Sequence, residues 1–122
     1  LQEEELRFSP SVPEQWIIEE NGISFQTRRT QGRSSGLFLD QRGNRALVRS
    51  LAKGKSVLNL FAYTCGFSVA AALGGASEVL SVDTSKAYLE WGKENFRKNH
   101  LDVDNYKFIH EDAREFLRRS VK

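Results

Sequence analysis

Residues 57–85 read VLNLFAYTCGFSVAAALGGASEVLSVDTS and carry the strongest structural signal in the chain. The run Ser56–Leu60 is short, apolar and typical of a buried strand. The loop Phe61–Gly66 follows it and leads into an alanine-rich helix that a pair of glycines ends. A second strand, Glu78–Asp83, comes next. Because strands joined through a helix lie parallel in one sheet, this stretch predicts an α/β fold.

The same alternation of strand and helix continues on both sides of this stretch. Downstream, we expect a helix that Ser85 caps and that runs to about Asn99, a third strand at Tyr106–His110 and a last helix that Asp112 opens. Upstream, we expect Asp40 to cap another helix. The whole pattern predicts a partial Rossmann-like fold with three parallel strands and helices.

An antiparallel hairpin is predicted ahead of the α/β region. The strands Trp16–Glu20 and Ile23–Thr27 flank Asn21-Gly22, and Asn-Gly is a strong hairpin signal because both turn residues need positive φ. We therefore divide the chain into an N-terminal segment with the hairpin, residues 1–30, and an α/β region, residues 31–122.

Composition limits the class of protein. Of the 122 residues, 39% are hydrophobic and 28% are charged, so the chain can form a packed core. No stretch approaches the roughly 20 apolar residues of a membrane helix. A single cysteine cannot form an internal disulfide, and the acidic start differs from a signal peptide, so we expect a cytoplasmic protein with no membrane partner. The chain has no methionine, and we expect it to be a piece of a longer protein.

Charge is segregated along the chain. Residues 1–22 carry six glutamates and one arginine, whereas residues 23–55 carry eight lysines and arginines against one aspartate. The arginine-rich stretch suits phosphate groups, because a guanidinium can hold two oxygens at once. A solvated, positively charged surface is the simpler interpretation of the same stretch.

Three features fall at the carboxyl ends of the predicted parallel strands, where open α/β sheets bind ligands. The loop Phe61–Gly66 precedes a helix N-terminus that can hold an anionic group, although its one glycine does not match the G-x-G-x-x-G fingerprint. Asp83 is placed either to accept hydrogen bonds from both hydroxyls of a ribose or to cap the next helix. Asp112 either contacts a ligand or begins a capping box. Together these features predict an adenosine-containing ligand.

Cys65 and the two histidines are weaker candidates. Cys65 stands at a predicted helix N-terminus, where a thiol pKa can be lowered, but cysteines in such loops are more often inert and packed. His100 and His110 have no acidic or cysteine neighbours at the spacing of a metal site. We therefore predict no bound metal, and the sequence does not indicate an oligomeric state.

The motifs together resemble a known family. The stretch VLNLFAYTCGFSVAAALGGASEVLSVDTS, preceded by GLFLDQRGNR and followed by ENFRKNHL and IHEDAREFL, is similar to the class I S-adenosylmethionine-dependent methyltransferases. Within them it resembles the bacterial methyltransferases of large-subunit ribosomal RNA that modify cytosine C5 or guanine N7. The resemblance covers about Glu20 to Leu117. It implies a methyltransferase with S-adenosyl-L-methionine as its cofactor and ribosomal RNA as its substrate.

The resemblance also implies seven cofactor-binding residues. It assigns Phe61, Tyr63, Thr64 and Gly66 to the methionine end of the cofactor, Asp83 to the ribose, Asp112 to the adenine amino group and Arg42 to the carboxylate. Two positions depart from the family pattern. Asn59 stands where most class I methyltransferases have an acidic residue, and Cys65 stands where this group often has glycine.

The resemblance implies that the chain holds only part of a catalytic domain. Residues 31–122 correspond to the N-terminal half of the methyltransferase domain, and the family's fourth motif, which holds the target base, lies beyond Lys122. The hairpin within residues 1–30 is the family's usual link to an upstream RNA-binding module. We therefore expect no catalytic residue here and little activity from this piece alone. A nucleotide-dependent Rossmann oxidoreductase and a non-catalytic RNA-binding module are the alternative functions.

Overall fold

The computed structural model describes residues 14–29 and 35–121. An antiparallel hairpin precedes a three-stranded parallel sheet with helices, which confirms the predicted α/β fold. The first elements are β1 (Gln15–Glu20), β2 (Ile23–Arg28), the 3-10 turn η1 (Leu39–Gln41) and α2 (Arg42–Leu51). The later ones are β3 (Ser56–Leu60), α3 (Gly66–Leu73), β4 (Glu78–Asp83), α4 (Lys86–Lys98), η2 (Val103–Asn105), β5 (Lys107–His110) and α5 (Ala113–Ser120).

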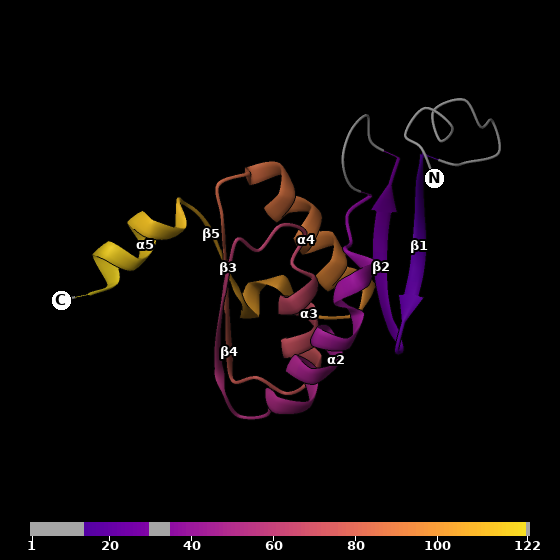
Figure 1. Cartoon of the computed structure of the whole chain (residues 1–122), viewed down its shortest axis with the longest axis horizontal. Coiled ribbons are helices and arrows are strands. Elements are labelled where there is room, and N and C mark those ends of the chain that lie inside the picture. Colours follow the sequence, from indigo (N-terminus) through magenta and orange to yellow (C-terminus); the bar gives the residue numbers. More distant parts are fainter. Residues whose placement is uncertain (1–13, 30–34, 122) are drawn as a thin grey trace.

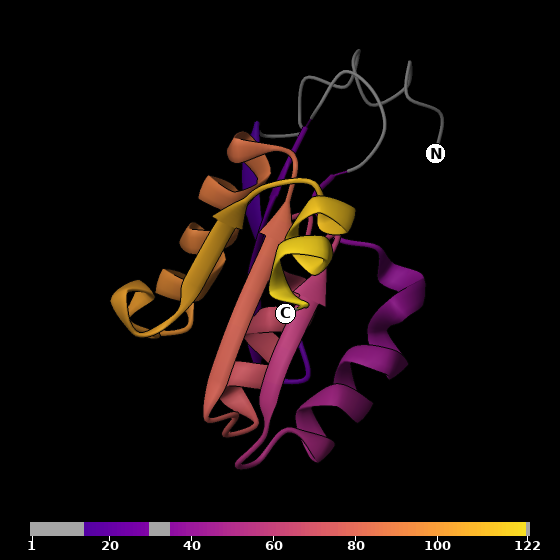
Figure 2. The same ribbon diagram turned by 90° about the vertical axis from the view of Figure 1, so that its left-hand side faces the viewer.

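The molecule is layered around the parallel sheet, whose strand order is β3-β4-β5. Figure 1 shows the sheet nearly edge-on, with α3 and α4 on the side of the hairpin and α5 on the opposite side. Figure 2 looks at the sheet from the α5 side, with β3, β4 and β5 side by side behind that helix. The carboxyl ends of all three strands therefore meet at one edge, because the strands are parallel.

The core lies between the sheet and the helices α3 and α4. Phe25, Val69, Val79 and Phe96 are each at most 1% exposed. Helix α3 is buried along most of its length, which explains why its sequence is rich in alanine and lacks a polar face. Small side chains let the helix approach the sheet closely.

The hairpin is anchored to α4 along the outer edge of β2. Asn21 and Gly22 adopt φ values of 52° and 80°, as the predicted Asn-Gly turn requires. On the strand edge that faces away from β1, the backbone of Ser24 bonds the side chain of Asn99, and the backbone N–H of Gln26 donates to Asn95. An unpaired strand edge is thus covered by helix side chains.

The predicted capping role of Asp40 is wrong. Helix α2 begins at Arg42, and its N-cap residue, Gln41, makes no side-chain capping bond. Asp40 is instead exposed within η1, where the N–H of Gln41 donates to the carbonyl of Phe38 at 3.1 Å. The tighter 3-10 turn precedes the helix and delays its start.

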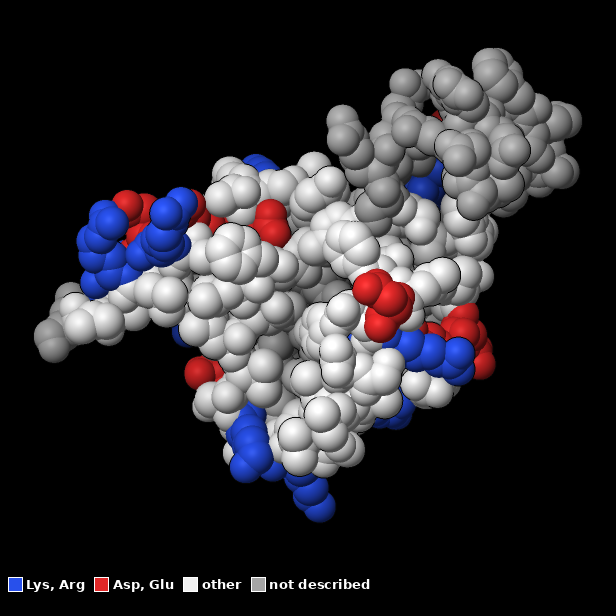
Figure 3. Space-filling model, in the orientation of Figure 1, with Lys and Arg blue, Asp and Glu red and all other residues white. Residues whose placement is uncertain are grey.

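The arginine-rich stretch does not form one continuous solvated surface. Arg45 is only 2% exposed, and the guanidinium of Arg28 lies 4.1 Å from the centre of the Trp91 ring. Arg33 lies outside the described residues. Figure 3 shows Lys and Arg side chains gathered over α5, interleaved with acidic ones, while the middle of this face is mostly white with a few acidic side chains.

Candidate cofactor site

The loop that joins β3 to α3 has an unusual backbone. Phe61, Tyr63 and Cys65 adopt positive φ values of 56°, 54° and 67°. A left-handed conformation costs a residue other than glycine on the order of 1–3 kcal/mol, and such strain persists where the surrounding structure enforces it, commonly at ligand sites. The N–H of Cys65 donates to the carbonyl of Ala62 at 2.8 Å and closes a tight turn inside the loop.

Asp83 is held beside this loop at the end of β4. One carboxylate oxygen, Oδ2, accepts the backbone N–H of Tyr63 at 2.8 Å, and the other, Oδ1, accepts that of Ser85 at 2.8 Å. The cap of α4 is Ser85, whose hydroxyl accepts the N–H of Tyr88, so Asp83 does not serve as that cap. Because a carboxylate has about four lone-pair sites, each oxygen retains capacity for a ligand hydroxyl.

Asp112 follows the neighbouring strand and begins α5. Its Oδ1 accepts the backbone N–H groups of Arg114 and Glu115 at 2.9 and 3.1 Å, which confirms the capping role. The side chain of Glu115 pairs with Arg118 rather than completing the predicted capping box. The backbone carbonyl of Asp83 accepts the N–H of Glu111, so the two aspartates lie at the same edge of the sheet.

Helix α4 packs against the loop and donates a hydrogen bond to it, a role that the sequence alone did not indicate. The ring of Tyr63 contacts Tyr88, with centroids 4.7 Å apart, and also Trp91 at 6.4 Å. The side chain of Asn95 donates to the carbonyl of Thr64 at 2.9 Å. The only available signal was the helical spacing of these residues, which equally fits an ordinary core face.

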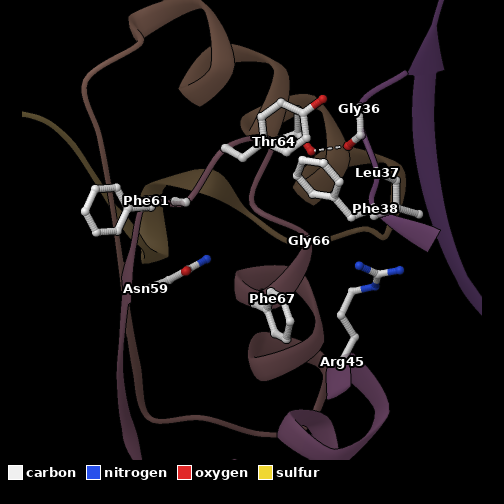
Figure 4. A pocket seen from close by; sticks show the side chains of 11 residues that line it. Gly36, Leu37, Phe38, Arg45, Asn59, Phe61, Thr64, Gly66 and Phe67 are labelled. Atoms are coloured by element: carbon white, nitrogen blue, oxygen red, sulfur yellow. Dashed lines mark hydrogen bonds between the residues drawn. The ribbon is translucent and has the colours of Figure 1, made fainter. Parts of the chain in front are cut away.

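A small cavity opens between the loop, the N-terminus of α3 and the segment before η1. Its lining includes Phe38, Asn59, Phe61, Thr64 and Phe67, and it has a volume of about 90 Å³. Figure 4 shows the ring of Phe61 lying apart from the other side chains, in agreement with its 75% exposure. Pockets for whole drug-sized ligands begin at roughly 300 Å³, so this cavity can take only one part of such a ligand.

Two arginines of α2 differ in their position relative to the cavity. Arg42, the predicted partner of a carboxylate, is the exposed first residue of the helix and does not line the cavity. Arg45 lines it, but its Nε and Nη2 each donate to a carboxylate oxygen of Glu20 at 2.7 Å. Arg45 is therefore committed to an internal ion pair, and the role of Arg42 stays a prediction.

Cys65 and Gly66 serve the packing of the loop. Cys65 is fully buried, and this burial raises the pKa of its thiol to about 12. A thiol with that pKa is protonated at neutral pH and is a poor nucleophile, so the structure favours the inert interpretation. A Cβ on Gly66 would lie 3.2 Å from the side chain of Leu37, which means that the space beside this glycine is filled by the protein.

Neither a metal centre nor a membrane helix is found in the described part of the chain. Residues 14–29 and 35–121 contain no group of three His, Cys, Asp or Glu side chains that could hold a metal ion. Among the helices formed by these residues, none combines the length and apolar character needed to cross a bilayer.

Two curated relatives carry the name ribosomal RNA large subunit methyltransferase K/L. The chain is 48% identical over 104 residues to the one from Psychrobacter sp. strain PRwf-1. These aligned residues make up 84% of this chain and 13% of the relative. It is 48% identical over 102 residues to the one from Shewanella frigidimarina, and these residues make up 84% of this chain and 14% of that relative. The chain thus spans only a small part of the length of these relatives.

Solved structures show the same similarity in three dimensions. A methyltransferase crystallised with S-adenosylhomocysteine (SAH) superposes with a TM-score of 0.86 at 41% identity, over 93% of this chain and 30% of that one. An S-adenosylmethionine-dependent methyltransferase from Agrobacterium tumefaciens superposes with a TM-score of 0.84 at 32% identity, over 93% and 37%. The family model for S-adenosylmethionine-dependent methyltransferases matches residues 5–119. The chain belongs to the S-adenosylmethionine-dependent methyltransferase family.

Proposed function

We propose that this chain is the cofactor-binding part of a methyltransferase that acts on large-subunit ribosomal RNA. The observation that carries the proposal is the carboxylate of Asp83, which the N–H groups of Tyr63 and Ser85 fix at the carboxyl end of β4. A carboxylate at this position is placed to accept hydrogen bonds from ribose hydroxyls. Membership of a methyltransferase family favours this function over a nucleotide-dependent oxidoreductase.

The candidate residues divide the cofactor between them. Asp83 binds the ribose and Asp112 binds the adenine amino group. The methionine end lies against the left-handed loop and the N-terminus of α3, where Phe61, Tyr63, Thr64 and Gly66 are found. Arg42 reaches the carboxylate from the start of α2. Both aspartates and the loop lie at one edge of the sheet, which supports a single elongated ligand across the three strand ends.

The residues present act by binding and orientation. S-adenosylmethionine, when bound, supplies an electrophilic methyl group on a sulfonium. The anchored carboxylate and the rigid loop hold the ligand without reorganisation, which lowers the entropic part of the barrier to transfer. The groups that would orient the target base are not assigned to this chain.

The wider organisation is also part of the proposal. The names of the relatives support ribosomal RNA as the substrate class. Residues 31–122 form the N-terminal half of the catalytic domain, and the segment 1–30, with its hairpin, links that domain to an upstream module. The hydrogen bonds that anchor β2 on α4 support a fixed link rather than a free one.

Calorimetry with SAH tests the proposal. We expect the wild-type chain to bind SAH, and Asp83→Ala to weaken the binding at least about tenfold because the ribose loses its acceptor. The matched control is Asp102→Ala. The Oδ1 of Asp102 accepts the N–H of Asp104, just as Asp83 accepts the N–H of Ser85, but Asp102 precedes β5 and so lies toward the amino ends of the strands. Binding of NADH without any response to SAH would contradict the proposal.

Binding of RNA separates the proposal from a non-catalytic RNA-binding module. Affinity for RNA that falls steeply with salt indicates phosphate contacts. We expect Asp83→Ala to leave that salt dependence unchanged while most of the affinity for SAH is lost. A chain that binds RNA but shows no affinity for SAH would support the module instead.

A further inference from the structure

Asn95 connects the hairpin to the loop of the candidate cofactor site. It lies on α4 and is fully buried. Its Oδ1 accepts the backbone N–H of Gln26 on β2 at 2.8 Å, and its Nδ2 donates to the backbone carbonyl of Thr64 at 2.9 Å. One side-chain amide therefore satisfies backbone groups of two separate segments.

Thr64 ties the loop with positive φ values to neighbouring segments through two hydrogen bonds. It is 1% exposed and lies between Tyr63 and Cys65, both of which have positive φ. Its hydroxyl donates to the carbonyl of Gly36, and its own carbonyl accepts from Asn95. A buried carbonyl that lost its donor would favour a different backbone conformation, because an unsatisfied buried acceptor is costly.

We propose that Asn95 is a positioning residue for the cofactor, acting through Thr64 on the left-handed loop. This inference rests on the proposed cofactor site. The orientation of the Asn95 amide is fixed at its other end by the N–H of Gln26, so the hairpin sets the geometry of the loop. Tyr63, next to Thr64, donates its N–H to Asp83, and the same geometry therefore extends to the ribose-binding carboxylate.

Asn99 provides a matched control one helical turn further along. Its Oδ1 accepts the N–H of Ser24 at 2.9 Å, and its Nδ2 donates to the carbonyl of Ser24 at 2.7 Å. It therefore anchors the same strand through the same chemistry. The Nδ2 of Asn99 also donates to the backbone carbonyl of Asn95 within α4, whereas the Nδ2 of Asn95 donates to Thr64 in the loop.

The experiment compares Asn95→Asp with Asn99→Asp in the full chain. Each change keeps an acceptor for the N–H of β2 and, with the new carboxyl ionised, replaces the amide donor by a negatively charged second acceptor of nearly the same shape. We expect both variants to lose stability, but only Asn95→Asp to weaken SAH binding, by at least about tenfold. Equal losses of affinity in the two variants, or unchanged affinity in Asn95→Asp, would overturn the proposal.

Hydrogen exchange separates this proposal from the proposed function. The N–H groups of Tyr63 and Cys65 are bonded within the site, to Asp83 and to Ala62. We expect both to exchange at least about tenfold faster in Asn95→Asp, relative to the amides of β4, and to keep their rates in Asn99→Asp. If wild-type chain failed to bind SAH, the proposed function would fail, and these rates would still test the positioning role. Unchanged rates would refute it.

A measurement on the wild-type chain covers the case in which Asn95→Asp does not fold. During an NMR titration with SAH, we expect the side-chain amide of Asn95 and the backbone amide of Gln26 to shift together. The side-chain amide of Asn99 and the backbone amide of Ser24 should shift much less. Equal shifts in both pairs would contradict a specific path through Asn95.

Discussion

Glu20, at the end of β1, and Arg45, on α2, form a buried bidentate ion pair. The two N···O distances are both 2.7 Å, and the side chains are 5% and 3% exposed. The pair joins the hairpin to the α/β region, and its Arg45 also lines the cavity. If one partner is removed, the other charge remains buried and unpaired. The free-energy cost of that unpaired charge is larger than the net stability that the intact pair contributes.

We predict that removing one partner of this pair destabilises the chain strongly. Glu20→Leu or Arg45→Met should each lower the free energy of unfolding by about 3–5 kcal/mol. The double variant Glu20→Leu with Arg45→Met should recover most of that loss, because neither charge is left behind. Urea denaturation at neutral pH measures all three values. A double variant as unstable as the sum of the single ones would contradict the argument.

The exposed pair of Arg118 and Glu115 on α5 is the control. Its N···O distance is even shorter, 2.6 Å, but the two side chains are 71% and 56% exposed. Removing either side chain should change the free energy of unfolding by less than about 1 kcal/mol. These two outcomes together would show that burial, rather than the N···O distance, decides how much an ion pair stabilises this chain.

A second prediction concerns the contact between α4 and the loop. A Cβ on Gly92 would overlap the Sγ of Cys65, so Gly92→Ala should destabilise the chain by about 1–3 kcal/mol through overpacking. Cys65→Gly removes the clashing sulfur and also suits the positive φ at that position. In a double-mutant cycle of unfolding free energies, we expect Gly92→Ala to cost much less in the Cys65→Gly background. Additive effects would show that the two residues do not compete for the same space.

The buried thiol gives a prediction for high pH. The pKa of Cys65 is raised from 9.0 to about 12 because burial disfavours the thiolate. The unfolded chain loses this proton first, so stability is fully present below pH 9 and falls as pH rises from 9 toward 12, by about 1.4 kcal/mol per pH unit. Cys65→Ala has no thiol at this position and therefore lacks this pH-dependent loss of stability. Between pH 8 and pH 10, the wild type should therefore lose about 1.4 kcal/mol more than the variant.

Local patterns explain which parts of the fold could be predicted. The Asn21-Gly22 turn, the strand that ends at Asp83 and the cap at Asp112 each depend on a few adjacent residues, and all three are present. The start of α2 could not be predicted in the same way. Asp40 is a good capping residue, but the chain enters a 3-10 turn first, and a propensity for capping does not reveal that.

Contacts between distant segments explain what the sequence could not show. The bonds from β2 to Asn95 and Asn99 join residues 69 and 75 positions apart. An asparagine on a helix carries no local sign of its partner, since its amide bonds a turn, a strand edge or water equally well. The commitment of Arg45 to Glu20 was hidden for the same reason, so the basic stretch looked more uniform in the sequence than it is in the structure.

The last prediction separates two roles of Asp112. Asp112→Ala removes the acceptor for the N–H groups of Arg114 and Glu115, and it should cost about 1 kcal/mol of stability. Asp112→Ser keeps a capping oxygen but has no carboxylate, so it should retain the stability of the wild type. If Asp112 also binds the adenine amino group, both variants should bind SAH several-fold more weakly, since a charged acceptor has been removed in each. Thermal unfolding and calorimetry on the two variants give the answer. An Asp112→Ser variant with wild-type affinity for SAH would leave Asp112 with the capping role alone.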